Sequence, residues 1–415
     1  MTGKWHLDEE PTNFGFQRYF GHLSGATNYF KGDNTFRLNG KKWEVPEKGF
    51  YTTTANVDYG LKFIAEAREE NKPWFLYIAF NAPHAPLQPL KEDYQKYQER
   101  YHSGWDKMNS SRFAKQKKVG LLPADLKPSP RPDHIPAWDS LTAELKDWEA
   151  RRMAALAGMI DRVDQETGRI IADLEAAGEL DNTLIVFVSD NGACPYDRIS
   201  KNPNAEPYLA TTSWSDSTGW AWARNTPFQF YKQNQFEGGI STPAIFHWPS
   251  GLKTKPGTVT DTPAHLVDLL PTIAEITGAT IPEEFPGREP TPLAGVSITP
   301  VFAGQEMKSR PPIHLLFHTD RGLRDGDWKL VSFKSLTWEL YNIADDRTEL
   351  NNLAAKEPKR LAAMITEWNK ITKETMGINP KPVATESNSK TNREWSDYSG
   401  KNGIKTTRRS PKKKE

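Results

Sequence analysis

Residues 184–192 read Leu-Ile-Val-Phe-Val-Ser-Asp-Asn-Gly, an apolar run that ends in two side chains bearing oxygen and a glycine. The apolar part is short and does not alternate with polar residues, which predicts a strand buried on both faces. Residues 74–80 and 244–246 have the same character. Buried strands separated by amphipathic stretches favour a mostly parallel sheet flanked by helices. The sequence therefore predicts an α/β fold.

Two amphipathic stretches predict the helices that cover this sheet. Apolar residues recur at helical spacing from Met153 to Leu174, and Gly178 follows as a helix stop. Residues 265–277 predict a second helix, which Pro271 kinks or restarts. Both lie next to predicted strands, as helices packed on a sheet do.

The pattern of apolar and polar residues changes after the α/β part. We expect a catalytic domain over residues 1–284, a linker rich in Pro and Gly at 285–295, a subdomain over 296–378 and a disordered basic tail over 379–415. Within the subdomain, short apolar runs and one amphipathic stretch predict a small antiparallel sheet with a helix. The runs are residues 313–317, 328–333 and 338–341, and the helix is 358–370.

Composition excludes several classes of protein. The formal net charge of the 415 residues is +1, so no global charge indicates nucleic acid as a partner. No apolar run approaches the roughly 20 residues of a membrane span, and no export signal is evident at the N-terminus. Cys194 is the only cysteine, so an internal disulfide is impossible. The oligomeric state cannot be inferred from these properties.

Polar side chains follow two of the predicted strands. Asp190 and Asn191 come directly after residues 184–188, and His84 lies between two prolines after residues 74–80. The carboxyl ends of strands in α/β sheets are where ligands bind. Carboxylate and amide oxygens suit Ca²⁺ or Mg²⁺ rather than zinc. The alternatives are a simple Asp-Asn turn and a half-buried loop histidine.

Two lysines extend this set of candidates. Lys4 and His6 are two residues apart, so in an extended segment both side chains leave the same face, a pair that suits a tetrahedral oxyanion. Lys232 precedes Glu237-Gly238-Gly239, where glycines allow a sharp turn at a site. Each lysine could instead be an ordinary surface residue.

Four segments together resemble one family in order and spacing. They are Gly-Lys-Trp-His-Leu at 3–7, Ala-Pro-His-Ala-Pro-Leu-Gln at 82–88, Ser-Asp-Asn-Gly-Ala at 189–193, and Lys232 with Glu-Gly-Gly at 237–239. The chain resembles the sulfatases of the arylsulfatase type, within the alkaline-phosphatase-like superfamily, from residue 1 to about residue 376. The resemblance implies an alkaline-phosphatase-like sheet and a sulfuric ester hydrolase that acts on aryl or carbohydrate sulfates.

The resemblance also implies a role for each candidate residue. The substrate is a sulfate ester, and the cofactor is a divalent metal, usually Ca²⁺ and otherwise Mg²⁺. Members of the family are commonly exported, so a periplasmic or extracellular location is expected. The implied catalytic residues are Lys4, His6 and Lys232; His84 would hydrogen-bond the sulfate, His6 would bind the aldehyde hydrate of formylglycine, and Asp190 and Asn191 would be metal ligands.

Two features of the family are missing from this sequence. In such enzymes a C/S-x-P-S-R motif, which supplies formylglycine, and a pair of Asp metal ligands lie upstream of the segment at 3–7. Residues 194–198, Cys-Pro-Tyr-Asp-Arg, do not match that motif. We therefore expect an N-terminally truncated chain with weak metal binding, no turnover and an unpaired strand edge.

Two alternative functions are weighed against the sulfatase. A phosphatase or phosphodiesterase of the same superfamily would carry Asp-His after the strand, and Asn191 argues against it. A non-catalytic remnant that binds sulfated glycans through Lys4, His84 and Lys232 is the other reading. It needs no nucleophile.

Overall fold

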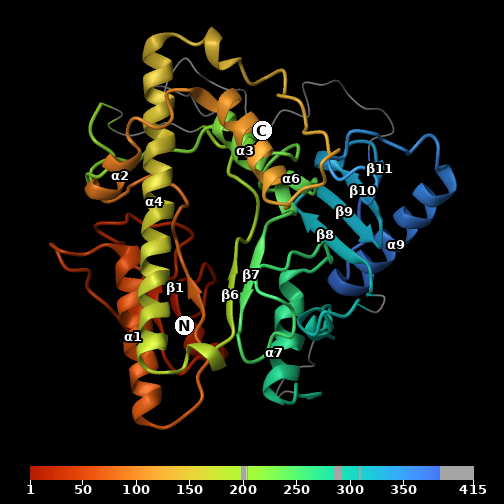
Figure 1. The fold of residues 1–415 in the computed structure, drawn as a ribbon. Coiled ribbons are helices and arrows are strands. Elements are labelled where there is room, and N and C mark those ends of the chain that lie inside the picture. Colours follow the sequence, from red (N-terminus) through yellow and green to blue (C-terminus); the bar gives the residue numbers. More distant parts are fainter. Residues whose placement is uncertain (198–201, 203, 285–291, 308–309, 384–415) are drawn as a thin grey trace, which may run out of the picture.

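The computed structural model describes residues 1–197, 202, 204–284, 292–307 and 310–383 (Figure 1). One sheet has the order β4-β3-β2-β1-β5. Strand β1 pairs in parallel with both β2 and β5, while β3 and β4 add antiparallel strands at one edge. The bounds are β1 (Thr2–Lys4), β2 (Phe20–His22), β3 (Phe36–Leu38), β4 (Lys41–Lys42) and β5 (Ile78–Ala79).

Two long helices, α1 (Thr52–Glu69) and α4 (Ala143–Ala176), pack against each other beside this sheet (Figure 1). The predicted long helix is confirmed, although it begins earlier than its apolar pattern, because Thr142 caps it by accepting a hydrogen bond from Leu145 N. Gly178 follows it at φ 70°. No helix among the described residues is long and apolar enough to cross a membrane.

The remaining helices of the α/β part are short. The predicted helix at 265–277 is α7 (Leu269–Thr277), preceded by a 3₁₀ turn at Leu266–Asp268. Pro271 lies in the first turn of α7, where its missing N–H has no intrahelical partner to lose. The others are α2 (Lys91–Tyr97), α3 (Gly104–Lys118), α5 (Thr218–Asn225), α6 (Glu237–Ile240) and α8 (Thr299–Phe302), with 3₁₀ turns at Pro11–Phe14, Trp138–Ser140, Leu180–Asn182 and Phe333–Ser335.

The strands β6 (Ile185–Val188) and β7 (Ala244–His247) correct two expectations. They form an antiparallel pair separate from the first sheet, so the described sheets are mixed rather than mostly parallel. Neither strand is buried on both faces, and the predicted strand at 74–80 shrinks to β5. The runs at 74–80 and 184–188 are exposed because they border a large cavity instead of packed side chains.

The C-terminal part is a four-stranded antiparallel sheet covered by one helix, as predicted. Its order is β11-β10-β9-β8, and helix α9 (Pro358–Met376) packs through the buried Trp368. The sequence did not predict β9, whose residues Asp-Arg-Gly-Leu-Arg-Asp lack an apolar run; pairing on both sides makes it a strand. The bounds are β8 (Ile313–Phe317), β9 (Asp320–Asp325), β10 (Trp328–Ser332) and β11 (Glu339–Asn342).

The largest apolar core lies around α4 and is rich in tryptophan. Trp214, Trp220 and Trp222 are buried in this core, where Trp220 Nε1 donates to Glu149 O at 2.8 Å. Most of the predicted linker, 285–291, and the tail from 384 onward lie outside the described residues.

Candidate functional site

Three strand ends meet at one edge of the fold. β1 ends at Lys4, β5 leads into the loop that carries His84, and β6 leads to Asp190. β1 and β5 are parallel with Gly3 opposite Ala79, so Lys4 and the His84 loop leave the sheet at the same edge. Only glycine fits at position 3, because a Cβ there would lie 2.1 Å from Ala79 O. Motifs that are far apart in the sequence therefore lie together at one site.

The two lysines of the site are close enough to affect each other. Burial lowers the pKa of Lys4, and the positive charge of Lys232 lowers it further, whereas the carboxylate of Asp190 raises it. One carboxylate beside two ammonium groups leaves the cluster net positive. A site of this kind is prepared for an anion with several oxygens.

His6 and His84 lie at the same site as the two lysines. Burial lowers the pKa of His6, and the nearby Lys4 and Lys232 add to the shift. His6 has φ 62°, a left-handed conformation that is costly for a residue other than glycine and that clusters at functional sites. Its ring lies against Gly25, where an added Cβ would be 2.4 Å from His6 Nε2. The left-handed backbone and the contact with Gly25 orient this imidazole, which is otherwise exposed.

His84 is held by its own loop. Its Nδ1 lies 2.7 Å from Ala85 O, and a carbonyl only accepts, so Nδ1 carries a proton. Burial lowers the pKa of His84, and Lys232 and Lys4 lower it further. In the neutral form Nε2 is therefore an acceptor. It can donate to a bound anion only after protonation, which an anion in the site favours.

The loop after β6 and the loop that carries Lys232 are tied to each other by backbone contacts. Gly192 N donates to Gly239 O at 3.0 Å, and Lys232 N donates to Ala193 O at 3.1 Å. Asp190 and Lys232 are therefore positioned relative to each other by the main chain rather than by flexible side chains.

Asn225, a residue that the sequence analysis missed, strengthens the same junction. Its Oδ1 accepts from Ala193 N at 2.9 Å, and its Nδ2 donates to Gly238 O at 2.7 Å and Phe230 O at 2.9 Å. One amide side chain thus satisfies three backbone groups of the two loops. No local pattern marks Asn225, since its partners are distant in the sequence.

Asp190 and Asn191 are the candidate metal ligands. Asn191 Oδ1 is buried and has no hydrogen-bond partner among the described residues, so it has an unused acceptor. Together with the Asp190 carboxylate it offers two hard oxygens, which fit Ca²⁺ or Mg²⁺. Within the described ranges no cluster of three or more His, Cys, Asp or Glu could hold a metal. Two oxygens are fewer than the six or more ligands that Ca²⁺ takes.

Cys194 follows the same loop and differs from a reactive thiol. It is partly buried, and burial raises its pKa to about 12. The nucleophilic form of cysteine is the thiolate, which is scarce near neutral pH at such a pKa. Cys194 is therefore a poor nucleophile near neutral pH.

The fold and this site define the class of protein. The chain belongs to the sulfatase family, whose family model, described as Sulfatase, matches residues 1–279, and thus to the alkaline-phosphatase-like superfamily. A second model, described as N-sulphoglucosamine sulphohydrolase, C-terminal, matches residues 228–375 and so spans the Lys232 loop and the antiparallel sheet.

Several relatives can be compared over most of the chain. It is 32% identical to an uncharacterized sulfatase of Schizosaccharomyces pombe, over 89% of this chain and 73% of the relative. It is 27% identical to an arylsulfatase of Klebsiella aerogenes, over 72% of this chain and 69% of the relative. The solved structure of Ps i-CgsB matches 92% of this chain and 73% of its own with a TM-score of 0.63 and 25% identity.

Proposed function

We propose that this site binds the sulfate group of a carbohydrate or aryl sulfate ester and orients it for the hydrolysis that the sulfatase family carries out. The observation that carries the proposal is the convergence of Lys4, Lys232 and His84 beside Asp190. Lys4 and Lys232 would contact sulfate oxygens, and their mutual repulsion is relieved when an anion lies between them. A carbohydrate substrate is favoured by the relative named N-acetylglucosamine-6-O-sulfatase, which is 25% identical over 89% of this chain.

A divalent cation, preferably Ca²⁺, would be held by Asp190 and Asn191, with further oxygen ligands from outside the described residues. When bound, such a cation polarises the sulfate oxygens and stabilises charge that develops on them. The residues of this chain orient the ester: the lysines hold the oxygens, protonated His84 donates from Nε2, and His6 binds the hydrated aldehyde nucleophile that the family uses.

We further propose that the 415 residues alone do not turn over a sulfate ester. The C/S-x-P-S-R motif is absent from the sequence, and the pKa of Cys194 keeps it protonated. The chain would then bind sulfate without cleaving it, as the glycan-binding alternative also requires. In both readings Lys4, His84 and Lys232 bind the sulfate. The readings differ in whether a nucleophile is supplied.

The test measures binding and turnover separately. With Ca²⁺ present, we expect sulfate binding in calorimetry and no hydrolysis of a chromogenic aryl sulfate or of glucosamine 6-sulfate. Lys232→Ala should weaken sulfate binding by about tenfold or more, since a charge-assisted hydrogen bond contributes roughly 1.5–3 kcal/mol. Lys356→Ala, at an exposed lysine of the C-terminal part, is the control and should bind normally. Robust turnover by the chain would overturn the account of the nucleophile, and equal binding by both variants would overturn the site.

A further inference from the structure

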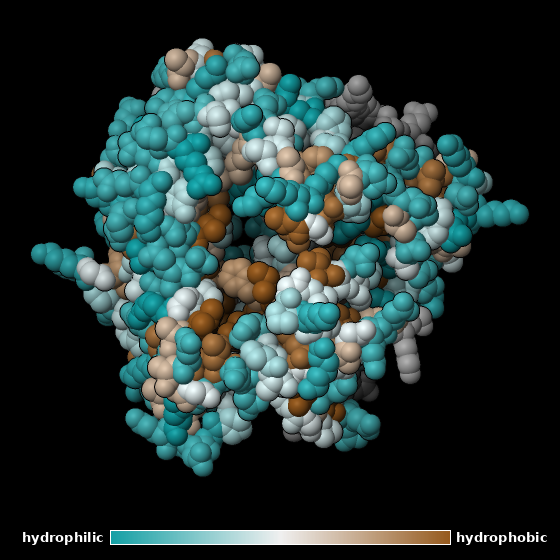
Figure 2. Space-filling model, in the orientation of Figure 1, coloured by the Kyte–Doolittle hydropathy of each residue, from teal (hydrophilic) through white to brown (hydrophobic). Residues whose placement is uncertain are grey.

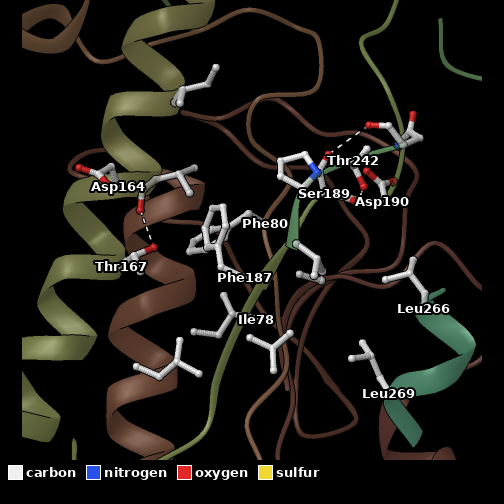
Figure 3. Close-up of a pocket in the computed structure, with 18 of the residues that line it drawn as sticks. Ile78, Phe80, Asp164, Thr167, Phe187, Ser189, Asp190, Thr242, Leu266 and Leu269 are labelled. Atoms are coloured by element: carbon white, nitrogen blue, oxygen red, sulfur yellow. Dashed lines mark hydrogen bonds between the residues drawn. The ribbon is translucent and has the colours of Figure 1, made fainter. Parts of the chain in front are cut away.

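Two separate cavities border the candidate site. The larger has a volume of about 3220 Å³, and Figure 2 shows a central hollow in which apolar side chains gather. In Figure 3 the apolar Ile78, Phe80 and Phe187 lie below Asp190 in this cavity. These three side chains neither donate nor accept a hydrogen bond. A sugar that is held by its sulfate therefore needs a different, polar surface for its hydroxyl groups.

The smaller cavity, which we call the Asp33 pocket, is lined mostly by polar side chains. Residues 26–28, Asp33, Pro86 and residues 210–213 form it, and none of them lines the larger cavity. Its volume is about 390 Å³, near the lower end of the roughly 300–1,000 Å³ found for small-molecule sites. This size suits a single sugar ring rather than a longer chain.

The Asp33 pocket adjoins both histidines of the candidate site. The His6 ring lies against Gly25, which directly precedes the pocket residue Ala26. Pro86 of the pocket follows His84 by two residues in the same loop. The pocket and the candidate sulfate site are therefore neighbours, as the two ends of one small substrate require.

The two walls of the pocket are joined by amide side chains. The buried Gln88 accepts from Tyr29 N through Oε1 at 2.9 Å, and its Nε2 donates to Thr212 O at 2.7 Å. Asn28 Nδ2 donates across the pocket to Ala210 O at 2.9 Å. The walls are thus held in place before a ligand arrives, which lowers the entropy cost of binding.

Asp33 is the only charged residue that lines the pocket within the described part of the chain. Burial alone would raise the pKa of Asp33, but hydrogen bonds from Ser24 and Thr35 lower it overall, so the carboxylate is ionised near neutral pH. It accepts from Ser24 Oγ, Thr35 N and Thr35 Oγ1. A carboxylate has about four acceptor positions, so one is left for a ligand. The charge favours a hydroxyl donor and repels an anion.

Other side chains of the pocket supply donors. Asn28 Nδ2 carries a second N–H besides the one that bonds to the opposite wall. The hydroxyls of Thr211 and Ser213 make no hydrogen bond to another described residue, and a hydroxyl can both donate and accept. Pro86 adds an apolar surface for the C–H groups of a ring. This combination fits a ring that carries several hydroxyl groups better than a plain aryl ring.

We propose that the Asp33 pocket binds the hydroxyl groups of the sugar ring that carries the sulfate, and that it excludes a second anionic group on that ring. The inference rests on the proposed function, since the bound sulfate anchors the sugar beside the pocket. It makes the substrate a carbohydrate sulfate rather than an aryl sulfate. A site built to hydrogen-bond a hydroxyl rejects an analogue that lacks it, because the polar groups of the site are then left unpaired.

The experiment compares two sulfate esters of similar shape on the 415-residue chain with Ca²⁺ present. Glucose 6-sulfate carries ring hydroxyls, whereas cyclohexylmethyl sulfate has a six-membered ring and the same ester link without them. Calorimetry measures both dissociation constants. We expect glucose 6-sulfate to bind about tenfold more tightly, which corresponds to one or two net hydrogen bonds. Equal affinities would overturn the proposal.

Two variants at accessible hydroxyls locate the contact with little effect on the fold. Thr211→Val and Ser213→Ala should each weaken the binding of glucose 6-sulfate about threefold or more and leave that of cyclohexylmethyl sulfate unchanged. Ser110→Ala, at an exposed serine of α3 that lines neither cavity, is the control and should change neither affinity. If both pocket variants behaved like the control, the assignment of the pocket would be wrong.

Asp33→Asn tests the exclusion of a second anion. The amide keeps the size of the side chain and an oxygen that can accept from Thr35 N. In the unmodified chain, glucose 2,6-disulfate should bind about threefold or more weakly than glucose 6-sulfate, and in Asp33→Asn this difference should disappear. Tighter binding of the disulfate by the unmodified chain would contradict the exclusion.

The binding of cyclohexylmethyl sulfate reports on the sulfate site alone. If this ester binds and the sugar hydroxyls add no affinity, only the inference about the Asp33 pocket is wrong. If neither ester binds, the proposed function is wrong and the pocket inference is wrong with it.

Discussion

His22 shows how tightly the residues behind the site are packed. It lies opposite Lys4 in the neighbouring strand β2, is fully buried, and its Nδ1 is 3.0 Å from Ser24 O. Burial lowers the pKa of His22 to about 4, and its Nε2 has no partner among the described residues. A charged His22 is therefore strongly disfavoured in the folded state.

This burial predicts acid sensitivity. The unfolded state gains the proton first, so the contribution of His22 is complete above pH 6.5 and is lost as the pH falls from 6.5 to about 4. The loss is about 3 kcal/mol over that window. His22→Asn, which keeps a donor but cannot ionise, should flatten the pH dependence of the unfolding free energy measured in urea. An unchanged slope in that variant would show that His22 does not carry the effect.

Specific contacts also decide what each histidine of the site can do. Ala85 O sets the proton position on His84, and burial together with the two lysines lowers the pKa of His6. The sequence pattern proposes these side chains as candidates. The protonation of these histidines depends on residues that lie close in space, which the sequence pattern does not identify.

At the scale of elements, the site depends on the close approach of two loops. A Cβ on Gly192 would lie 1.8 Å from Gly238 O, which belongs to the main chain of α6 and cannot move aside cheaply. The glycines of both motifs thus let the loop of Asp190 and the loop of Lys232 touch.

A pair of alanine substitutions tests this contact. Gly192→Ala should destabilise the fold by about 2 kcal/mol through overpacking and should weaken sulfate binding, because the two loops are forced apart. Gly168→Ala, at an exposed helical position of α4 with open space around it, should stabilise by roughly 0.5–1 kcal/mol. Thermal unfolding and sulfate titration measure both variants. If Gly192→Ala behaved like Gly168→Ala, the contact would not matter.

At the scale of the whole molecule, a buried ion network joins the C-terminal sheet to the site. Lys329 of β10 contacts Glu237 Oε1 at 2.6 Å and Glu349 Oε1 at 2.8 Å, and Glu237 N donates to Glu349 Oε2 at 2.7 Å. Arg347 also pairs with Glu237. Burial lowers the pKa of Lys329 to about 8 and raises that of Glu349 to about 7, while their contact opposes both shifts.

Removing one member of this network should be costly. We expect Lys329→Met to lower the unfolding free energy by about 3–5 kcal/mol, because it leaves buried carboxylates without their cation. It should also speed hydrogen exchange in α6, since Glu237 begins that helix five residues after Lys232. Lys356→Met, at an exposed lysine, should stay within about 0.5 kcal/mol. Equal denaturation midpoints for the two variants would contradict a role for the network.

Local patterns were sufficient for much of the architecture. The periodicity from Met153 to Leu174 predicted α4, and residues 313–317 predicted β8 with the bounds that are observed. The α/β class and the small antiparallel sheet with its helix were also predicted. The spacing of apolar residues did not predict β9, because its sequence is polar. It is a strand because two neighbouring strands pair with it.

The sequence by itself determined which chemical groups follow two of the strands, because strand and turn signals are local and His84 and Asp190 come after apolar runs. Only the tertiary structure decided the antiparallel pairing of β6 with β7, the bridging role of Asn225, the Lys329 network and the open cavity. These features depend on contacts between residues far apart in the chain. No periodicity records such contacts, since their free energy arises only when the distant surfaces meet.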